Sequence, residues 1–171
     1  MVTEDGNGVP SPLDAVLSDP TLTEQERANI ALVLHFRTVP FSERSKYTIA
    51  GFKPTRVGMA NLAEVKDPAA PAYTAQSIPD RRDEMLAVIA HGDRVWAIWN
   101  ICGTHLGDMY GLPPTGRRLQ VTEIGQWRIE DGLITEAWFL VDELALLRQL
   151  GAWSGLPQPE HESSSASTKA E

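Results

Sequence analysis

The chain has 171 residues, of which 42% are hydrophobic and 22% are charged, a composition typical of a globular domain. Its net charge of -8 and isoelectric point near 5.0 argue against nucleic acid as a partner, because no basic stripe is available to neutralise phosphates. The single cysteine excludes an intramolecular disulfide, and no Cys/His cluster has metal-site spacing. No apolar run approaches the roughly 20 residues that cross a bilayer, and the acidic N-terminus does not resemble a signal peptide. We therefore expect no membrane partner and a cytoplasmic location.

One folded unit is expected between two polar tails. Residues 1–20 and 155–171 are predicted to be disordered, since the second stretch is rich in Ser, Pro and Glu and has almost nothing to bury. Residues 21–154 contain the regular hydrophobic patterns and no internal repeat. The sequence therefore predicts a single domain over this range.

The first half of this domain has helical patterns. Thr21–Val39 has apolar residues at helical spacing, with Thr23 as an expected N-cap and Glu26 three residues later to complete a capping box. Phe41–Tyr47 fits a second short helix. The proline-rich stretch that follows has no clear pattern beyond a short helix expected around Met59–Val65.

The second half changes to alternating patterns. The runs Glu84–Ala90 and Arg94–Cys102 flank a Gly-centred turn and predict one hairpin, while Arg118–Ile129 and Leu133–Val141 flank an Asp-Gly turn and predict another. A closing helix is expected at Glu143–Leu150. Helices followed by an antiparallel sheet predict the α+β class, with the helices packed on one concave face.

A carboxylate ends the last predicted strand. Glu136, Trp138, Leu140 and Asp142 share one parity, so their side chains point the same way in an unbroken strand. An acid beside a tryptophan-lined face is a setting for a raised carboxylate pKa and acid–base chemistry. The alternative is that Asp142 caps the closing helix, where accepted N–H bonds lower the pKa instead.

Several motifs in this half resemble the SnoaL-like polyketide cyclase and ester cyclase family, within the nuclear transport factor 2-like and ketosteroid isomerase-like superfamily. Each motif is short, and their succession carries the resemblance. They are HGDRV (His91–Val95), GTHLGDMYGLPPTGRR (Gly103–Arg118), RIEDGLITEAW (Arg128–Trp138) and VDELALLRQLG (Val141–Gly151).

The resemblance implies a fold and a chemistry. It implies a strongly curved antiparallel sheet closed by N-terminal helices into a cone-shaped barrel around a deep apolar pocket. It also implies catalysis without a metal or organic cofactor, in which an aspartate on the last long strand acts as acid–base for an intramolecular aldol closure. Asp142 is the position that matches. The histidine that such cyclases have on the preceding strand is replaced here by Trp127, and the one after the first helix by Thr55 or Arg56.

Further site residues are predicted around Asp142. His105 stands between glycines, whose backbone bend can aim its imidazole at the pocket mouth, although a loop histidine bonded to a carbonyl is the competing interpretation. Strand tryptophans can line a flat cavity for a polycyclic ligand, or simply fill the core. Glu136 is either a second pocket acid or a structural partner of an arginine such as Arg128. The predicted substrate-binding residues are Trp138, Trp127, Trp99, Glu136, His35, Tyr110 and Met59.

These observations favour a cofactor-independent cyclase or isomerase of secondary metabolism. It would act on a polyketide-like or other apolar carbonyl substrate, with Asp142 and His105 as catalytic groups. The alternatives are an epoxide or ester hydrolase on the same fold, and a non-catalytic small-molecule-binding or assembly protein. The strand Val95–Trp99 is apolar on both parities, which predicts a homodimer that covers one sheet face.

Overall fold

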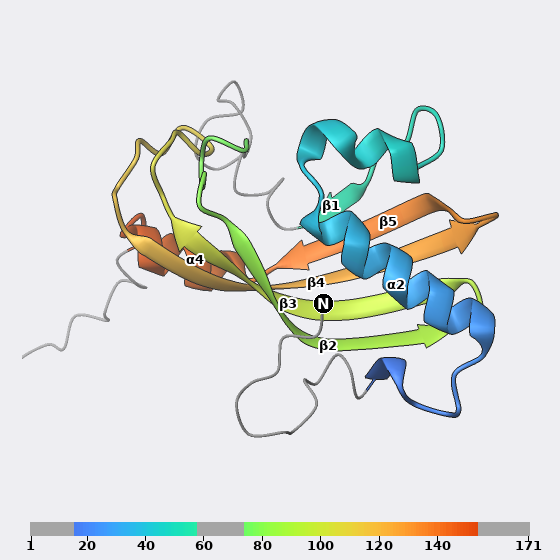
Figure 1. Cartoon of the computed structure of the whole chain (residues 1–171). Helices are drawn as coiled ribbons and strands as arrows, with labels where there is room; N and C mark the ends of the chain where they lie inside the picture. The colour runs from blue at the N-terminus through green and yellow to red at the C-terminus, as the bar shows by residue number, and fades with distance from the viewer. Residues whose placement is uncertain (1–15, 58–73, 154–171) are drawn as a thin grey trace, which may run out of the picture.

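The computed structural model describes residues 16–57 and 74–153, in which helical segments come first and the long strands follow (Figure 1). This order confirms the predicted α+β class. The short helix expected around Met59–Val65 lies outside the described residues, as do residues 1–15 and 155–171 of the expected tails. In chain order the elements are α2 (Glu24–Thr38), η1 (Phe41–Tyr47), β1 (Thr55–Val57), β2 (Arg82–His91), β3 (Arg94–Thr104), β4 (Arg118–Glu130), β5 (Leu133–Val141) and α4 (Glu143–Leu150).

The five strands form one mixed sheet in the order β1-β5-β4-β3-β2. The strands β2 to β5 are antiparallel neighbours, as the two hairpin patterns predict. The expectation of a wholly antiparallel sheet is wrong at β1, which pairs with β5 in parallel, Thr55 opposite Trp138. No tight turn joins these two strands, so the chain between them leaves their relative direction open. In the described residues the sheet is open, with β1 and β2 as its edges.

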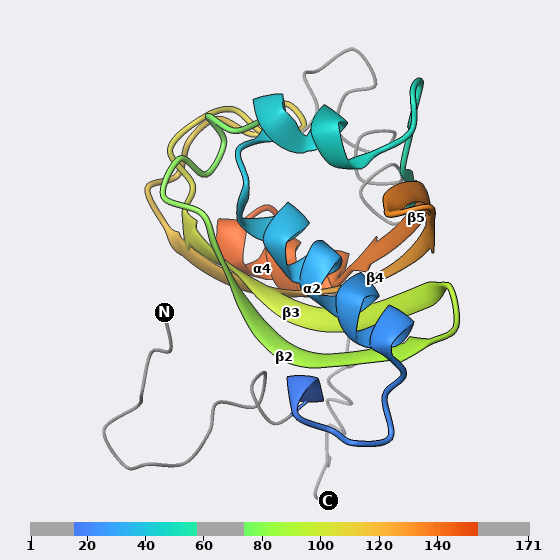
Figure 2. The same cartoon turned by 45° about the vertical axis from the view of Figure 1, so that its right-hand side comes forward.

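The helix α2 lies in the concavity of the curved sheet (Figure 2). The predicted capping box starts it: the Glu26 amide donates to Thr23 Oγ1 (3.2 Å), and the Thr23 amide donates to the Glu26 carboxylate (2.9 Å). The other Glu26 oxygen accepts from the Gly92 amide in the β2–β3 turn (2.9 Å). These backbone hydrogen bonds lower the pKa of Glu26 to about 2, so an ionised carboxylate ties the start of α2 to the sheet.

Three aromatic rings form the centre of the core beneath α2. Trp99 and Trp127 have ring centroids 5.6 Å apart, and Phe139 meets both edge-on. Gly125 faces them from β4, and a Cβ built on it would lie 2.6 to 2.9 Å from an atom of each ring. A glycine is therefore required where the three rings converge.

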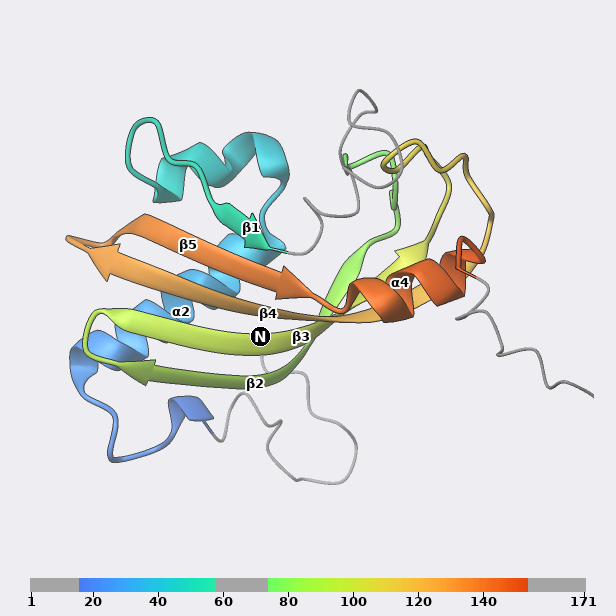
Figure 3. The same ribbon diagram turned by 180° about the vertical axis from the view of Figure 1, so that it is seen from behind.

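The last helix closes one end of the sheet. Its N-cap is Asp142, whose carboxylate accepts from the Ala145 amide (2.9 Å), and it ends at Gly151 in the left-handed conformation (φ 75°). Leu146 and Leu150 are its buried side chains. Figure 3, seen from behind, shows α4 beyond the end of β5. The helix α2 lies on the far side of the sheet in this view.

Candidate active site

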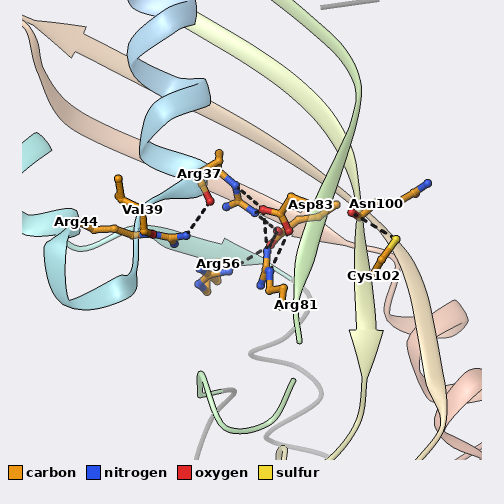
Figure 4. A network of polar contacts seen from close by, with 9 residues as sticks. Arg37, Val39, Arg44, Arg56, Arg81, Asp83, Asn100 and Cys102 are labelled. Atoms are coloured by element: carbon orange, nitrogen blue, oxygen red, sulfur yellow. Dashed lines mark hydrogen bonds and ion pairs between the residues drawn. The ribbon is translucent and has the colours of Figure 1, made fainter. Parts of the chain in front are cut away.

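Five charged side chains meet under the C-terminal end of α2, and we call them the arginine–carboxylate cluster. They come from α2, β1, the start of β2 and β4, segments far apart in sequence. Figure 4 shows Arg37 and Arg81 converging on the Asp83 carboxylate. Only 3% of the Arg37 side chain and 2% of the Glu123 side chain are exposed. The members are Arg37, Arg56, Arg81, Asp83 and Glu123.

Each carboxylate of the cluster is shared between arginines. Asp83 accepts from Nε of Arg37 (2.9 Å) and from Nε of Arg81 (2.9 Å), and Arg37 Nη2 also contacts its Oδ2. Glu123 accepts from Arg56 Nη1 at 3.2 Å, with Nη2 of Arg37 at 3.6 Å and of Arg81 at 3.7 Å. Three arginines surround two acids, so the cluster has a formal charge of +1.

The aromatic core forms the floor of this cluster. The guanidinium carbon of Arg37 lies 4.2 Å from the Trp99 ring centroid, and that of Arg56 lies 4.8 Å from the Phe139 centroid. Burial lowers the pKa of Arg37, while the charges of Asp83 and Glu123 oppose that shift. Buried charges are tolerated only where partners compensate them, so each member depends on the others.

The cluster borders a cleft of about 700 Å³. Asp83 and Arg81 stand in its wall with side chains 11% and 16% exposed, so both are within reach of a bound molecule. A second cleft of about 250 Å³ lies on the other side of Arg44 and includes Arg56 in its wall. The apolar side chains around the larger cleft include Leu34, Phe41, Ile78 and Met85.

The Asp142 carboxylate takes no part in the ion pairs of the cluster. Asp142 is exposed, it caps α4, and its backbone amide donates to the Thr122 carbonyl (2.9 Å). The predicted parity set does share one face, but that face is the outer one, on the side of the sheet away from α2. Ala137, Phe139 and Val141 share the buried parity of β5, and Ile134 is also buried, before the register shift that lies opposite Arg128 and Ile129.

The tryptophans divide between the two faces, so the expectation that three of them line one cavity is corrected. The register pairs Trp138 with Gln126 and Trp127 with Ala137. Trp99 and Trp127 are therefore buried on the inner face, whereas Trp138 lies on the outer face, 6.4 Å from Trp96 between ring centroids.

His105 and Tyr110 are both buried in the loop between β3 and β4. His105 Nδ1 accepts from the Thr115 amide (3.3 Å) and lies 3.1 Å from its hydroxyl, which places the proton of the neutral ring on Nε2. Nε2 has no hydrogen-bond partner among the described residues. Burial lowers the pKa of His105, so the ring is neutral at pH 7.

The other predicted residues are more peripheral. His35 is exposed on α2, and its Nε2 lies 2.8 Å from the Tyr47 hydroxyl, which joins α2 to η1. Glu136 is exposed and accepts from Arg128 Nη1 (3.2 Å), the structural alternative considered above. Met59 lies outside the described residues.

Sequence analysis missed all five members of the cluster as site residues. One signal was available in β4, where Leu119, Val121, Trp127 and Ile129 occupy the inner parity and Glu123 interrupts them. A single acid within such an apolar alternation indicates a buried, paired carboxylate. The partners of Glu123 had no comparable signal, since arginines near helix and strand ends are usually solvated.

Among residues 16–57 and 74–153, no helix is long and apolar enough to cross a membrane, and no three His, Cys, Asp or Glu side chains are grouped to hold a metal ion. No curated protein matches the chain. A family model described as SnoaL-like polyketide cyclase matches residues 68–150.

Solved structures share the fold at low sequence identity. AclR from Streptomyces galilaeus, named provisionally as a hydroxylase, is 23% identical with a TM-score of 0.59, over 76% of this chain and 85% of that one. A provisionally named SnoaL-like polyketide cyclase from Jannaschia is 18% identical with a TM-score of 0.61, over 78% and 98%. A protein from Acidithiobacillus ferrooxidans, provisionally named a polyketide cyclase, is 21% identical with a TM-score of 0.57, over 78% and 100%. Residues 68–150 are therefore similar to the SnoaL-like polyketide cyclase family, and the chain shares its fold with these solved structures.

Proposed function

We propose that the chain is a cofactor-independent, cytoplasmic cyclase or isomerase that transfers protons on an apolar carbonyl compound in the 700 Å³ cleft. The family match supports a cyclase-type activity. The observation that carries the proposal is the Asp83 carboxylate in the cleft wall, bonded to the Arg81 guanidinium at 2.9 Å. We further propose that α2, η1 and α4 complete the open sheet into the cone-shaped enclosure of an apolar pocket.

The proposed reaction uses Asp83 as the base and an arginine as the oxyanion stabiliser. Asp83 takes the proton from the carbon next to a carbonyl, the C–H electron pair forms the C=C bond of an enolate, and the C=O π pair moves onto the oxygen. Arg81 donates to that oxygen, where a fixed positive charge stabilises developing negative charge.

Ring closure returns the proton. The enolate carbon attacks a second carbonyl of the same molecule, and the alkoxide formed takes the proton from the Asp83 carboxyl group. No atom is gained or lost, so neither a redox partner nor an external acid is required.

A hydrogen-exchange assay tests this base without knowledge of the natural substrate. 2-Tetralone has acidic C–H groups beside its carbonyl, and exchange with D₂O is measured by proton NMR. We expect the protein to accelerate exchange, Asp83→Asn to reduce the acceleration by about a hundredfold or more, and Asp142→Asn to leave it nearly unchanged. Exchange lost in Asp142→Asn and kept in Asp83→Asn would instead assign the base to Asp142.

Asp83 also supports a second candidate, a non-catalytic ligand-binding protein. Asp83 is already paired with Arg37 and Arg81, and such an ion pair can orient a bound ligand without taking part in proton transfer. A binding protein would bind 2-tetralone without accelerating its exchange, so the same assay separates the two functions. The epoxide or ester hydrolase alternative would use the same carboxylate to activate water, and would require release of an alcohol or diol.

We also propose a homodimer that covers the outer face of the sheet. This face exposes large apolar side chains, with Ile89 67% and Trp96 44% exposed, and Trp96 lies beside Trp138. Contiguous apolar surface of this kind usually marks an interface. A second copy offers the same strands across a two-fold axis.

A further inference from the structure

Arg44 occupies an unusual position in the cleft. It lies in η1, and its guanidinium carbon stands 4.0 Å from the Phe41 ring centroid and 5.1 Å from that of Phe36. It belongs to the walls of both the 700 Å³ and the 250 Å³ clefts. A molecule in either cleft therefore meets this guanidinium.

The hydrogen bonds of Arg44 leave much of its donor capacity unused. Its Nε donates to the Val39 carbonyl and its Nη2 to the Arg37 carbonyl, both at 3.4 Å, the long end of the range (Figure 4). A guanidinium has five N–H donors in a planar fork. Within the described ranges, Arg44 forms no ion pair with a carboxylate, in contrast to the arginines of the cluster.

The wall of the larger cleft has an excess of positive charge. Among residues 16–57 and 74–153, its lining contains four arginines, Arg37, Arg44, Arg81 and Arg82, and one acid, Asp83. Burial, followed by the charges of Arg37 and Arg81, lowers the pKa of Arg44 to about 10. The guanidinium still carries its proton at pH 7. A bound anion would offset its repulsion from the neighbouring guanidinium groups. The chain as a whole has a net charge of -8, so this positive cleft is a local feature.

We propose that Arg44 binds the carboxylate of an apolar organic acid in the cleft, so that the substrate of the proposed cyclase is a free acid. This statement rests on the proposed function only in naming the molecule as a substrate. Planar carboxylates match the guanidinium fork and form two parallel charge-assisted hydrogen bonds. The apolar side chains Leu34, Phe41, Ile78 and Met85 surround the body of the same molecule, which favours an organic acid over inorganic phosphate.

A matched pair of probes tests the subsite. 2-Naphthoate and its methyl ester share one ring system and differ in charge, and calorimetry measures the affinity of the full-length protein for each. We expect the protein to bind the acid more tightly. Arg44→Gln should lose roughly tenfold or more of the affinity for the acid, as expected for a charge-assisted contact, and keep its affinity for the ester. Arg44→Lys keeps the charge without the fork and should lose less.

Arg82→Gln is the control, because Arg82 lines the same cleft but is already paired with Glu84 at 2.8 Å. It should leave the preference for the acid unchanged. Equal binding of acid and ester by the unaltered protein, binding of neither at millimolar concentration, or equal loss for both probes in Arg44→Gln would overturn the proposal. So would a loss in Arg82→Gln as large as that in Arg44→Gln.

The two proposals fail separately. Binding of naphthoate is measured without turnover, so a lost preference for the acid alongside intact 2-tetralone exchange overturns the Arg44 subsite alone. A kept preference alongside absent exchange overturns the acid–base function and leaves an acid-binding protein.

Discussion

Glu123 lies directly opposite Trp99 in the β3–β4 register, and Arg37 contacts both, at 3.6 Å from the carboxylate and 4.2 Å from the ring centroid. The carboxylate thus has arginine above it and indole beside it, with 2% of its side chain exposed. This arrangement joins the helix, the sheet and the cleft wall through one acid. Its disruption should therefore affect folding as well as chemistry.

Glu123→Gln should strongly destabilise the fold. The change removes the acid that Arg37, Arg56 and Arg81 share and leaves Asp83 as the one remaining acid of the cluster, and loss of a partner from a buried ion-pair group typically costs about 3–5 kcal/mol. Urea unfolding followed by tryptophan fluorescence measures the loss. Glu136→Gln is the matched control, since it removes a carboxylate from an exposed pair with Arg128 and should have a much smaller effect. Equal effects would contradict this account.

Asp142→Ala should lower stability by about 1 kcal/mol without loss of proton exchange on 2-tetralone. The carboxylate caps α4 through the Ala145 amide, and an N-cap contributes on this scale. Asp142→Asn keeps an acceptor oxygen and should lose less. Thermal unfolding and the exchange assay on the same two variants give both quantities, and a melting temperature that does not move while exchange disappears would support a catalytic Asp142.

Gly125→Ala should destabilise the core by about 1–3 kcal/mol, because the added methyl group overlaps the rings of Trp99, Trp127 and Phe139. A second substitution supplies the control. Trp99→Phe removes the indole atom that lies nearest the new methyl group, so it should cost less in the Gly125→Ala background than alone. Additive losses in this double-mutant cycle would show that the rings do not constrain position 125.

Stability should fall as the pH drops below about 6.5, in part through His105. Its pKa in the folded state is lowered by burial from an unfolded value of 6.5, so in this window the unfolded chain binds more protons than the folded one. The contribution of neutral His105 to the free energy of unfolding is fully present above about pH 6.5 and decreases as the pH falls below that value. His105→Asn should reduce the difference between unfolding free energies at pH 5 and pH 7.5. His91→Asn, at the exposed end of β2, is the control for loss of a histidine.

The proposed dimer predicts a mass of twice 18.8 kDa by light scattering at micromolar concentration. Ile89→Glu or Trp96→Glu should shift the mass toward the monomer, because a charge on the outer face opposes burial in an apolar interface. Leu144→Glu changes an exposed leucine on α4 and serves as the control. A mass near 18.8 kDa for the unaltered protein would refute the dimer.

Local features of this fold are predictable from sequence because their partners are close in the chain. The capping box of Thr23 and Glu26 spans three residues, the Asp-Gly turn joins adjacent strands, and Asp142 and Gly151 delimit a helix of eight residues. The parity of Asp142 was also predictable, since alternation along a strand is a local property. These features led to the α+β class, and the motifs between His91 and Gly151 led to the resemblance to the SnoaL-like family.

Tertiary structure decided which parity of β5 faces inward, and it decided the candidate site. Alternation along a strand separates its two faces but does not tell which face is buried. The packing of α2 on the sheet places Phe139 in the core and leaves Asp142 at the surface. Arg37, Asp83 and Glu123 lie 46 and 40 residues apart in sequence, by their numbering, and meet only when α2 crosses β2 and β4. A buried charge cluster depends on the simultaneous presence of all its partners. No single segment of the sequence contains that information.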